Sequence, residues 1–518
     1  MSKDSSKSHS RLRRDVGVWG SFMWGYADVG ADVYVALGIV IAAAQGAASL
    51  AFAIAGLVYI LIGLAYTELA STYPVAGGGQ YFSLRGLGDI WGFISGSALL
   101  LSYTVDIALF ATASAGYINF FMPYILGHGI ECYIINIGPF SINYFWYIES
   151  LGIILILVFI NIRGIKESSL LNEILGIVEI LTESGLVILG FLFAWSPEKF
   201  LYQWHTQQPS LNQFMYGTSL AIISFVGLES ISQAAQETRR PATIIPRTSI
   251  ALIFTVFLSA ISFSTLGLGI LDWQVFGEHQ SNPAAKLAEA IPYIGMIAGP
   301  FTAVMGAIIL FISSNTGVMG ASRLTFCMSQ FNLISKWFDY VHPKFKTPIR
   351  TIIVFSFVAV IELTVAFLTP KALGTLGNMY AFGATLGYIL VFLALIRLRY
   401  IDPYSPRSYK VPFNIKVKYH GNEVEFPIFA IIGAIGVSVI FFMVIWTHSI
   451  GRIAGPAWVI LCLIYYFVYR VKNKLPLIGS VERDWEKEQI EVLESAEEYD
   501  LAEQYKITLK ERDRRKSK

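Results

Sequence analysis

The chain has 518 residues, of which 55% are hydrophobic, 14% aromatic and only 14% charged. Soluble globular proteins carry about a quarter charged residues, so this composition excludes a soluble globule, and also the disordered, collagen-like and nucleic-acid-binding classes. The net charge of +2 says little until the 38 basic and 36 acidic residues are sorted by position. The composition predicts an all-α integral protein of the lipid bilayer.

Apolar stretches long enough to cross a bilayer as helices recur along the chain. The basic residues before the first stretch lead into a run too long and too polar for a cleavable signal peptide. We predict twelve transmembrane helices, at residues 16–44, 48–70, 90–122, 143–164, 170–195, 212–235, 248–270, 296–327, 349–368, 372–396, 427–447 and 453–470.

The basic residues lie mainly on one side of these spans. The opposite loops contain only Lys199, Lys286, Lys371 and Arg452. Because cytoplasmic loops carry the excess of Lys and Arg, both termini are predicted to be cytoplasmic, in the inner or plasma membrane. The loops on the amino-terminal side contain Arg85, Arg163, Lys166, Arg239, Arg240, Arg247, Arg323, Lys336, Lys344, Lys346, Arg350 and the basic residues between 397 and 418.

Two spans contain runs that a plain membrane anchor would not tolerate. The first holds Gly25-Tyr26-Ala27-Asp28-Val29-Gly30-Ala31-Asp32, in which glycines weaken the helix and two carboxylates share one face. The sixth holds Ser224-Phe225-Val226-Gly227-Leu228-Glu229. Interrupted helices at corresponding positions of two five-helix halves indicate an inverted-repeat transporter with its site near the midplane. Broken backbone at 29–31 and 225–227 is expected to shape the pocket.

Further acids lie inside other spans, namely Asp106, Glu173, Glu179, Glu183 and Glu362. A central Asp costs about 2.5 to 3.5 kcal/mol on insertion scales, and no Lys or Arg lies in the same stretches. Such carboxylates are either protonated and hydrogen-bonded in a packed bundle or line a wet cavity that takes up a cation. On the second interpretation, Asp28, Asp32 and Asp106 hold a positively charged group.

Several motifs, in order along residues 15 to 470, resemble the amino acid, polyamine and organocation (APC) superfamily. The sixth span resembles arginine/agmatine antiporters, whereas the first and third partly resemble potassium importers of the KUP and KimA type. The motifs are Glu68 to Pro74, Gly77 to Tyr81, Asn161 to Ser168, Ser224 to Ser230, Glu237, Pro246-Arg247, Ser313 to Thr316, Gly320 to Arg323, Val341 to Pro343 and Tyr409 to Pro412.

The resemblance implies a LeuT-type fold, with a five-plus-five inverted repeat, broken first and sixth helices and two extra C-terminal helices. The implied parts are a cytoplasmic amino-terminal tail (1–15), a first half (16–200), a second half (201–400), a linker with the last two spans (401–470) and a charged cytoplasmic tail (471–518). That tail is open to two interpretations: a solvated segment, or a helix that regulates the protein or binds a partner.

One departure from the family bears on the substrate. Amino-acid members carry a Gly-Ser-Gly-like stretch whose free N–H groups receive the substrate carboxylate. Here that place is taken by Gly30-Ala31-Asp32, with Asp28 just before it, and two carboxylates would repel a third. The departure favours a bare cation or amine. Asp106 likewise replaces a neutral ligating group of the potassium importers.

The resemblance also implies a proton as coupling ion and no further cofactor or metal. Glu179 lies where some proton-driven members keep a lysine, and Glu229 matches an acid used for proton-dependent release. Ser313 and Ser314 are assigned to the same coupling machinery. In arginine antiporters an aromatic side chain closes over the substrate. The matching position here is Ile223, so that lid is missing, and Phe225 is a weaker substitute.

The leading hypothesis is a secondary transporter that moves a small amino acid or a cationic amine or polyamine by alternating access coupled to protons. The substrate site would comprise Asp28, Val29, Gly30, Ala31, Asp32, Asp106, Ser224, Phe225 and Gly227. The alternative is an inorganic cation importer, most simply for potassium, that uses the same acids.

Other classes fit less well. No nucleophile with a base, no metal-ligand cluster and no phosphate loop points to an enzyme. The pair of broken helices favours a carrier over a channel, and a receptor-like sensor that uses the charged tail stays open.

Overall fold

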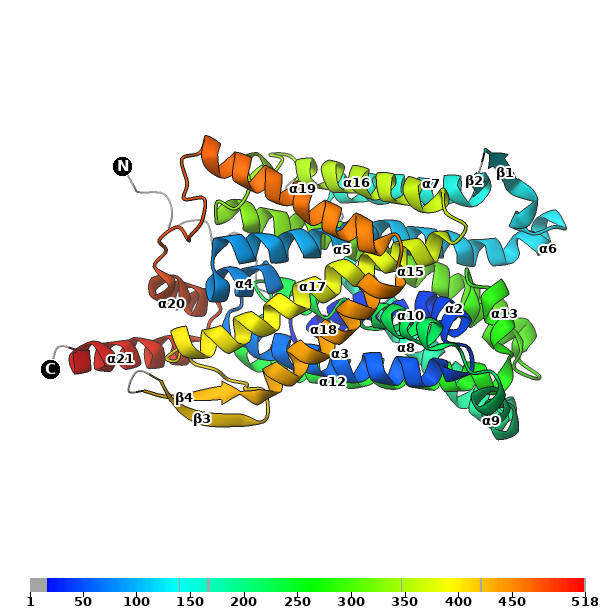
Figure 1. Cartoon of the computed structure of the whole chain (residues 1–518), viewed down its shortest axis with the longest axis horizontal. Helices are drawn as coiled ribbons and strands as arrows, with labels where there is room; N and C mark the ends of the chain where they lie inside the picture. The colour runs from blue at the N-terminus through cyan, green and yellow to red at the C-terminus, as the bar shows by residue number, and fades with distance from the viewer. Residues whose placement is uncertain (1–15, 139, 165–167, 346, 420–421, 517–518) are drawn as a thin grey trace.

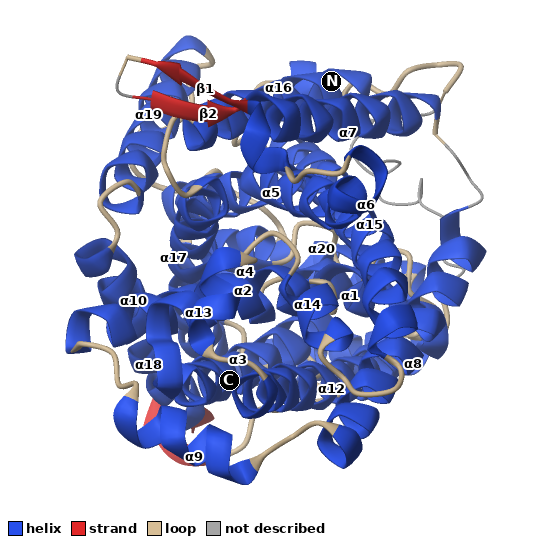
Figure 2. Ribbon diagram, turned by 90° about the vertical axis from the view of Figure 1, so that its right-hand side faces the viewer, coloured by secondary structure: helices blue, strands red, loops and turns tan. Residues whose placement is uncertain are grey.

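The computed structural model describes residues 16–138, 140–164, 168–345, 347–419 and 422–516. Long helices run side by side along the long axis, and short helices and hairpins lie at the two ends of this bundle (Figures 1 and 2). The predicted amino-terminal tail, 1–15, and residues 165–167 of the fourth-span motif lie outside the described residues.

Long helices coincide with the predicted spans. The first span is formed by α1 and α2, and the sixth by α10, the 3₁₀ segment η5 and α11. The spans are α1 (Val18–Val29) with α2 (Asp32–Ala44), α3 (Ala48–Thr72), α5 (Asp89–Ile118), α7 (Tyr144–Arg163), α8 (Ser168–Phe193), α10 (Leu211–Ala221) with η5 (Ile222–Phe225) and α11 (Glu229–Ala234), α12 (Pro241–Ile270), α15 (Gly295–Gln330), α16 (Ile349–Phe367), α17 (Ala372–Ile401), α18 (Ile428–Thr447) and α19 (Gly451–Lys472).

Eleven segments of the described residues are long and apolar enough to cross a membrane. The first of them, Val18–Thr72, has 55 residues and contains both the first and the second predicted spans, which the 3₁₀ segment η2 (Gln45–Ala47) separates. The predicted all-α multi-pass membrane protein is therefore confirmed. The inverted-repeat relation between its two halves stays a prediction.

Short elements connect the spans. At one end of the bundle lie α6, α9, α13, α14 and the hairpin β1–β2, whereas α4 and the hairpin β3–β4 lie at the other end (Figure 1). Their bounds are α4 (Gly79–Leu87), α6 (Met122–Leu126), β1 (Ile134–Ile137), β2 (Phe140–Asn143), α9 (Pro197–Thr206), α13 (Trp273–Glu278), α14 (Pro283–Glu289), β3 (Asn414–Tyr419), β4 (Asn422–Pro427), α20 (Trp485–Ser495) and α21 (Tyr499–Lys516), with 3₁₀ turns η3 (Asn119–Phe121), η4 (Ile130–Tyr133) and η6 (Lys336–Asp339).

The helix α5 forms the centre of the bundle. Nearly all of its apolar stretch is buried, and its main neighbours are α15 and α17. By contrast, only a minority of the residues in the apolar stretches of α7, α8 and α19 are buried, as expected of helices that face lipid. Residues on the inner face of α5 and α15 are therefore shielded from lipid, which is where polar groups in a membrane protein belong.

Both predicted helix interruptions are present, and they differ in kind. Gly30 and Ala31 form a two-residue turn between α1 and α2 and keep near-helical angles. The second interruption is an unwound segment, because Val226 is extended and Gly227 has a φ of +119°. Only glycine adopts that φ without strain, which explains the residue at this point.

The charged tail packs against the bundle. The helices α20 and α21 lie at the end that carries α4 and β3–β4, which we call the terminal face because Val16 also lies there, paired with Thr238. Their apolar face is buried, with Val492, Leu493 and Tyr505 each no more than 3% exposed. This placement contradicts the solvated-tail interpretation.

Candidate functional site

The unwound segment of the sixth span is closed by the carboxylate of Glu229. Its Oε2 accepts hydrogen bonds from the N–H of Gly227 at 3.1 Å and from the hydroxyl of Tyr388 on α17 at 2.8 Å. Glu229 therefore satisfies a backbone donor that the broken helix leaves free, and it links α11 to α17. It is buried, with 1% of its surface exposed.

Asp28, at the end of α1, meets two other elements. Its backbone carbonyl accepts a hydrogen bond from Ser313 on α15 at 3.2 Å, and its Oδ1 accepts one from the hydroxyl of Thr316. A Cβ placed on Gly227 would lie 3.0 Å from the Asp28 carboxylate. The two broken segments thus approach each other at this carboxylate.

Asp106, on α5, faces the same turn of α15. A Cβ placed on Gly317 would lie 2.5 Å from its Oδ2, so α15 can pass this close only because residue 317 is glycine. Its Oδ1 is buried without a hydrogen-bond partner. The neighbouring Ser314 donates to the carbonyl of Ile107 at 2.8 Å. The two serines of the predicted coupling set thus tie α15 to the backbone beside Asp28 and Asp106.

Asp32 begins α2 and is fully buried. Neither of its carboxylate oxygens has a hydrogen-bond partner. It follows Asp28 by four residues, across the turn at Gly30 and Ala31, and Asp106 and Glu229 are the other two acids described above. We call these four residues the acidic site.

The acidic site has no basic counterpart among the described residues, because none of the ion pairs between them includes Asp28, Asp32, Asp106 or Glu229. A carboxylate buried without a positive partner must bind a proton or a cation, since an isolated buried charge is strongly unfavourable. The arrangement can therefore exchange protons for a positively charged group. No set of three or more His, Cys, Asp or Glu in the described part is arranged to hold a metal ion.

A second pair of acids, Glu179 and Glu183, lies on α8. Glu183 accepts hydrogen bonds from Tyr26 on α1 at 2.9 Å and from Ser259 on α12 at 2.8 Å. Glu179 is fully buried, and neither of its carboxylate oxygens has a partner. Glu183 thus connects the broken first span to α8 and α12, one helical turn from the predicted coupling residue.

Glu183 also borders a small enclosed space that reaches both broken segments. Val29 and Gly30 line it from the first span and Ser224 from the sixth. The Ser224 hydroxyl and one Glu183 oxygen are buried there without partners. Ala31, also in the predicted set, is fully buried beside this turn.

The aromatic predicted as a lid, Phe225, is buried and stacks on Tyr59 of α3, with ring centroids 5.1 Å apart. In this conformation the ring is therefore a packing residue between η5 and α3.

Three side chains in or beside these clusters were not in the predicted set: Thr316 and Tyr388, which donate to Asp28 and Glu229, and Glu183, which accepts from Tyr26 and Ser259. Thr316 and Glu183 lie in stretches that the sequence had singled out, the former at the end of the Ser313 to Thr316 motif. Tyr388 had no signal, because a tyrosine in an apolar helix looks like a core residue until its partner Glu229 is placed.

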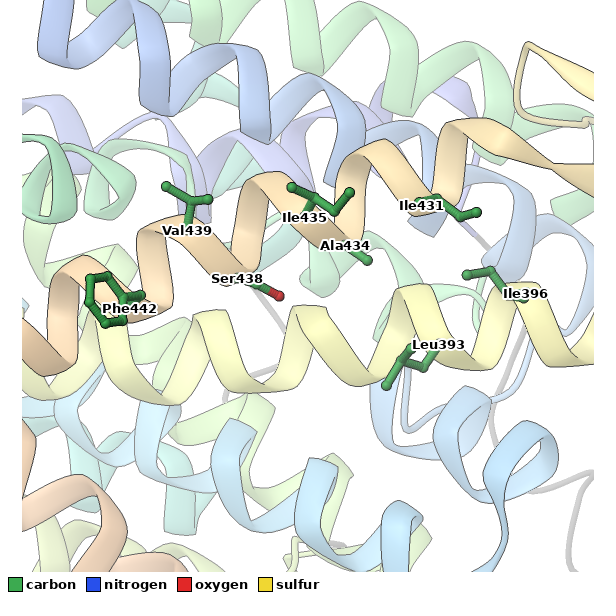
Figure 3. Close-up of a pocket in the computed structure, with 8 residues that line it drawn as sticks. All are labelled: Leu393, Ile396, Ile431, Ala434, Ile435, Ser438, Val439 and Phe442. Atoms are coloured by element: carbon green, nitrogen blue, oxygen red, sulfur yellow. The ribbon is translucent and has the colours of Figure 1, made fainter.

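A larger groove on the outside of the bundle does not suit a polar substrate. It runs between α17 and α18 and is lined by apolar side chains, among them Leu393, Ile396, Ile435 and Phe442 (Figure 3). Its one polar lining residue is Ser438. A groove of this kind on a lipid-facing surface suits acyl chains.

Comparisons with known proteins agree with this architecture. Residues 16–469 match the family model described as amino acid permease. The chain is 25% identical to the branched-chain amino acid permease BcaP of Bacillus subtilis (strain 168) over 477 residues, which cover 90% of this chain and 96% of that protein.

Other relatives differ in their named substrates. The methylthioribose transporter of the same bacterium is 25% identical over 452 residues (86% of this chain, 91% of the relative). The human cationic amino acid transporter 4 is 26% identical over 418 residues (78% of this chain, 63% of the relative). The family match spans nearly all the predicted helices, and the chain therefore belongs to the amino acid permease family of the APC superfamily.

Proposed function

We propose that this permease moves a small cationic amine or a cationic amino acid across the membrane by alternating access coupled to protons. The observation that carries the proposal is the acidic site: Asp28 and Glu229 lie at the unwound segment, and Asp106 lies beside Gly317 on α15, next to Thr316, which bonds to Asp28. None of the three has a basic partner among the described residues. A positive group there would gain several charge-assisted hydrogen bonds in a water-poor environment.

The relatives are consistent with this proposal without deciding it. Their names include cationic amino acids, branched-chain amino acids and methylthioribose. A neutral amino acid would place its own carboxylate near the N-terminal end of α2, where Asp32 lies. The substrate carboxylate and that of Asp32 would repel each other there, so the proposal favours substrates that carry a net positive charge.

A binding panel on the purified protein tests the substrate class. L-arginine and putrescine are expected to raise its melting temperature in a concentration-dependent way, since a ligand that binds only the folded state stabilises it. L-leucine and methylthioribose are expected to leave it unchanged. Stabilisation by L-leucine alone would overturn the cationic assignment. Stabilisation by rubidium alone would favour the potassium-type alternative.

Proton coupling is proposed to involve Glu179, with Glu229 as the other candidate. Glu179→Gln keeps the size of the side chain and removes its titration, so substrate uptake should lose its pH dependence. Glu362→Gln, at a buried acid held by Thr104 away from the acidic site, is the matched control. An unchanged pH profile in Glu179→Gln would move the role to Glu229 or Glu183.

A further inference from the structure

Residues 480–498, which we call the strap, cross the terminal face of the bundle. They comprise α20 and the residues on either side of it. Gln489 and Leu493 are each 1% exposed, whereas the side chains of Lys487 and Glu486 are 69% and 47% exposed. One side of the strap is therefore buried against the bundle, and its other side is charged and exposed to solvent.

The strap holds elements of the first half. Gln489 accepts a hydrogen bond from Arg85 of α4 at 2.8 Å and donates one to the carbonyl of Thr72, at the end of α3, at 2.8 Å. Glu488 accepts a hydrogen bond from the hydroxyl of Tyr81 at 2.9 Å. The strap thus supplies a hydrogen-bond donor to a carbonyl at the end of α3, where helical carbonyls lack partners within the helix.

The strap also holds elements of the second half. Glu498 accepts a hydrogen bond from the N–H of Ala242, at the start of α12, at 3.1 Å. Arg483 donates to the carbonyl of Phe331, just after α15, at 2.8 Å. The ring of Trp485 stacks on Phe331 at 6.2 Å. A single segment thus joins both halves at the same end of the molecule.

Further contacts join α11 and the residues after it to α5, α15 and the loop before α4. Arg323 of α15 pairs with Glu237 at 2.7 Å, and Gln233 of α11 donates to the hydroxyl of Tyr103 on α5. A Cβ on Gly78 would clash with Ser232 of α11, so α11 packs directly on the loop before α4. Release of a substrate at this end requires these elements to separate.

We propose that the strap is an autoinhibitory contact, which must leave the terminal face before the permease opens at that end. Its buried contacts favour the closed arrangement, because detachment exposes the apolar side chains of Val492 and Leu493 and leaves the partners of Gln489 unpaired. A factor that binds the free strap would shift the population toward the open state. The inference rests on the transport activity of the family and is independent of the proposed cationic substrate.

The test measures opening directly and needs no substrate. In a background with Cys132, Cys327 and Cys462 replaced by alanine, Ser232→Cys places one thiol on α11, where the serine is 2% exposed. The rate of its labelling by N-ethylmaleimide is compared between this parent and the same protein with Glu488→Ala and Gln489→Ala. The matched control carries Lys487→Ala and Glu491→Ala on the exposed side of α20.

Labelling in the Glu488→Ala, Gln489→Ala protein is expected to rise about tenfold, because the three hydrogen bonds to Arg85, Thr72 and Tyr81 are lost and their partners in the bundle are left without them. The control should label like the parent. An unchanged rate in a strap variant that keeps the parent's melting temperature would overturn the proposal, as would an equal rise in the control.

A milder variant covers the case in which the double variant fails to fold. Tyr81→Phe removes only a hydroxyl, which donates to Glu488 at 2.9 Å and accepts a longer bond from Arg85 at 3.4 Å. It should raise the labelling rate by a smaller factor in a protein of normal stability. No rise in this folded variant would overturn the proposal.

Discussion

At the scale of single residues, the acidic site depends on glycines that lie against its carboxylates. Gly227 lets the unwound segment approach Asp28, and Gly317 lets α15 approach Asp106, where any Cβ would lie within 3.0 Å of a carboxylate. Hydroxyl groups supply the remaining contacts, as in the bond from Thr316 to Asp28. Every charged member of the site is an acid, which is the reason that we propose a substrate with a positive group.

Asp28→Asn and Asp106→Asn should each weaken binding of L-arginine or putrescine by roughly 30-fold or more, since loss of a buried charge pair costs about 2 to 5 kcal/mol. Asparagine keeps the shape of the side chain, so folding should be preserved. Equilibrium binding of the labelled ligands measures the effect, with Glu362→Gln as the control. Unaltered affinity in both variants would show that these acids are structural.

His448 gives a pH-dependent contribution to stability. It lies between α18 and α19, is 1% exposed, and bonds to Ser219 at 2.7 Å. Burial lowers its pKa from 6.5 to about 3. As the pH falls below about 6.5, His448 is therefore protonated in the unfolded chain but stays neutral in the folded protein. Its contribution to the free energy of unfolding is complete above that pH and decreases as the pH falls toward 3.

His448→Gln can still bond to Ser219 but does not titrate. Its melting temperature should fall less than that of the parent between about pH 7.5 and about pH 5. Thermal unfolding followed across that range checks the difference. Parallel pH profiles of the two proteins would contradict the assignment.

At the scale of elements, the unwound segment of the sixth span carries the geometry of the site. Gly227→Ala should reduce ligand affinity by about tenfold or more, because residue 227 has a φ of +119° and its new Cβ would push on Asp28. Gly185→Ala is the matched control, since it lies in α8 with no heavy atom within 4 Å of the new Cβ. Equal affinities in the two variants would show that the unwound segment does not contribute to ligand binding.

The sequence predicted the long elements well, because twenty apolar residues in a row leave few alternatives to a membrane helix. It also located both interruptions, at Gly30 and Gly227. The short helices α4, α9 and α13 and the two hairpins were missed, since segments this short are set by their neighbours. The same reason hid Tyr388, whose role depends on a partner 159 residues away, and the buried face of α20.

At the scale of the whole molecule, buried ion pairs at the terminal face join distant parts of the chain. Asp89, at the start of α5, pairs with Arg470 at 2.8 Å and with Arg483 at 2.5 Å. Glu68 at the end of α3 pairs with Arg399 at 2.7 Å. Asp402, beyond α17, is partly buried, with 14% of its side chain exposed. Burial raises its pKa, but the nearby Arg85 and Arg407 more than offset this, so its pKa lies below the ordinary value.

Asp89→Asn should lower the free energy of unfolding by about 3 to 5 kcal/mol, because it leaves Arg470 buried without its charge partner. The melting temperature in detergent checks the loss. Lys506→Ala, which breaks an exposed pair with Glu494, should leave it unchanged. A similar stability of all three proteins would show that the buried pair contributes nothing beyond its local contacts.

Uptake into proteoliposomes tests the central claim most directly, with labelled L-arginine, putrescine, L-leucine and rubidium compared with and without a pH gradient. The acidic site predicts that L-arginine or putrescine accumulates, that the pH gradient drives the accumulation, and that Asp28→Asn abolishes it. Uptake of L-leucine or rubidium alone, or accumulation of L-arginine that is indifferent to both the gradient and Asp28→Asn, would contradict the claim.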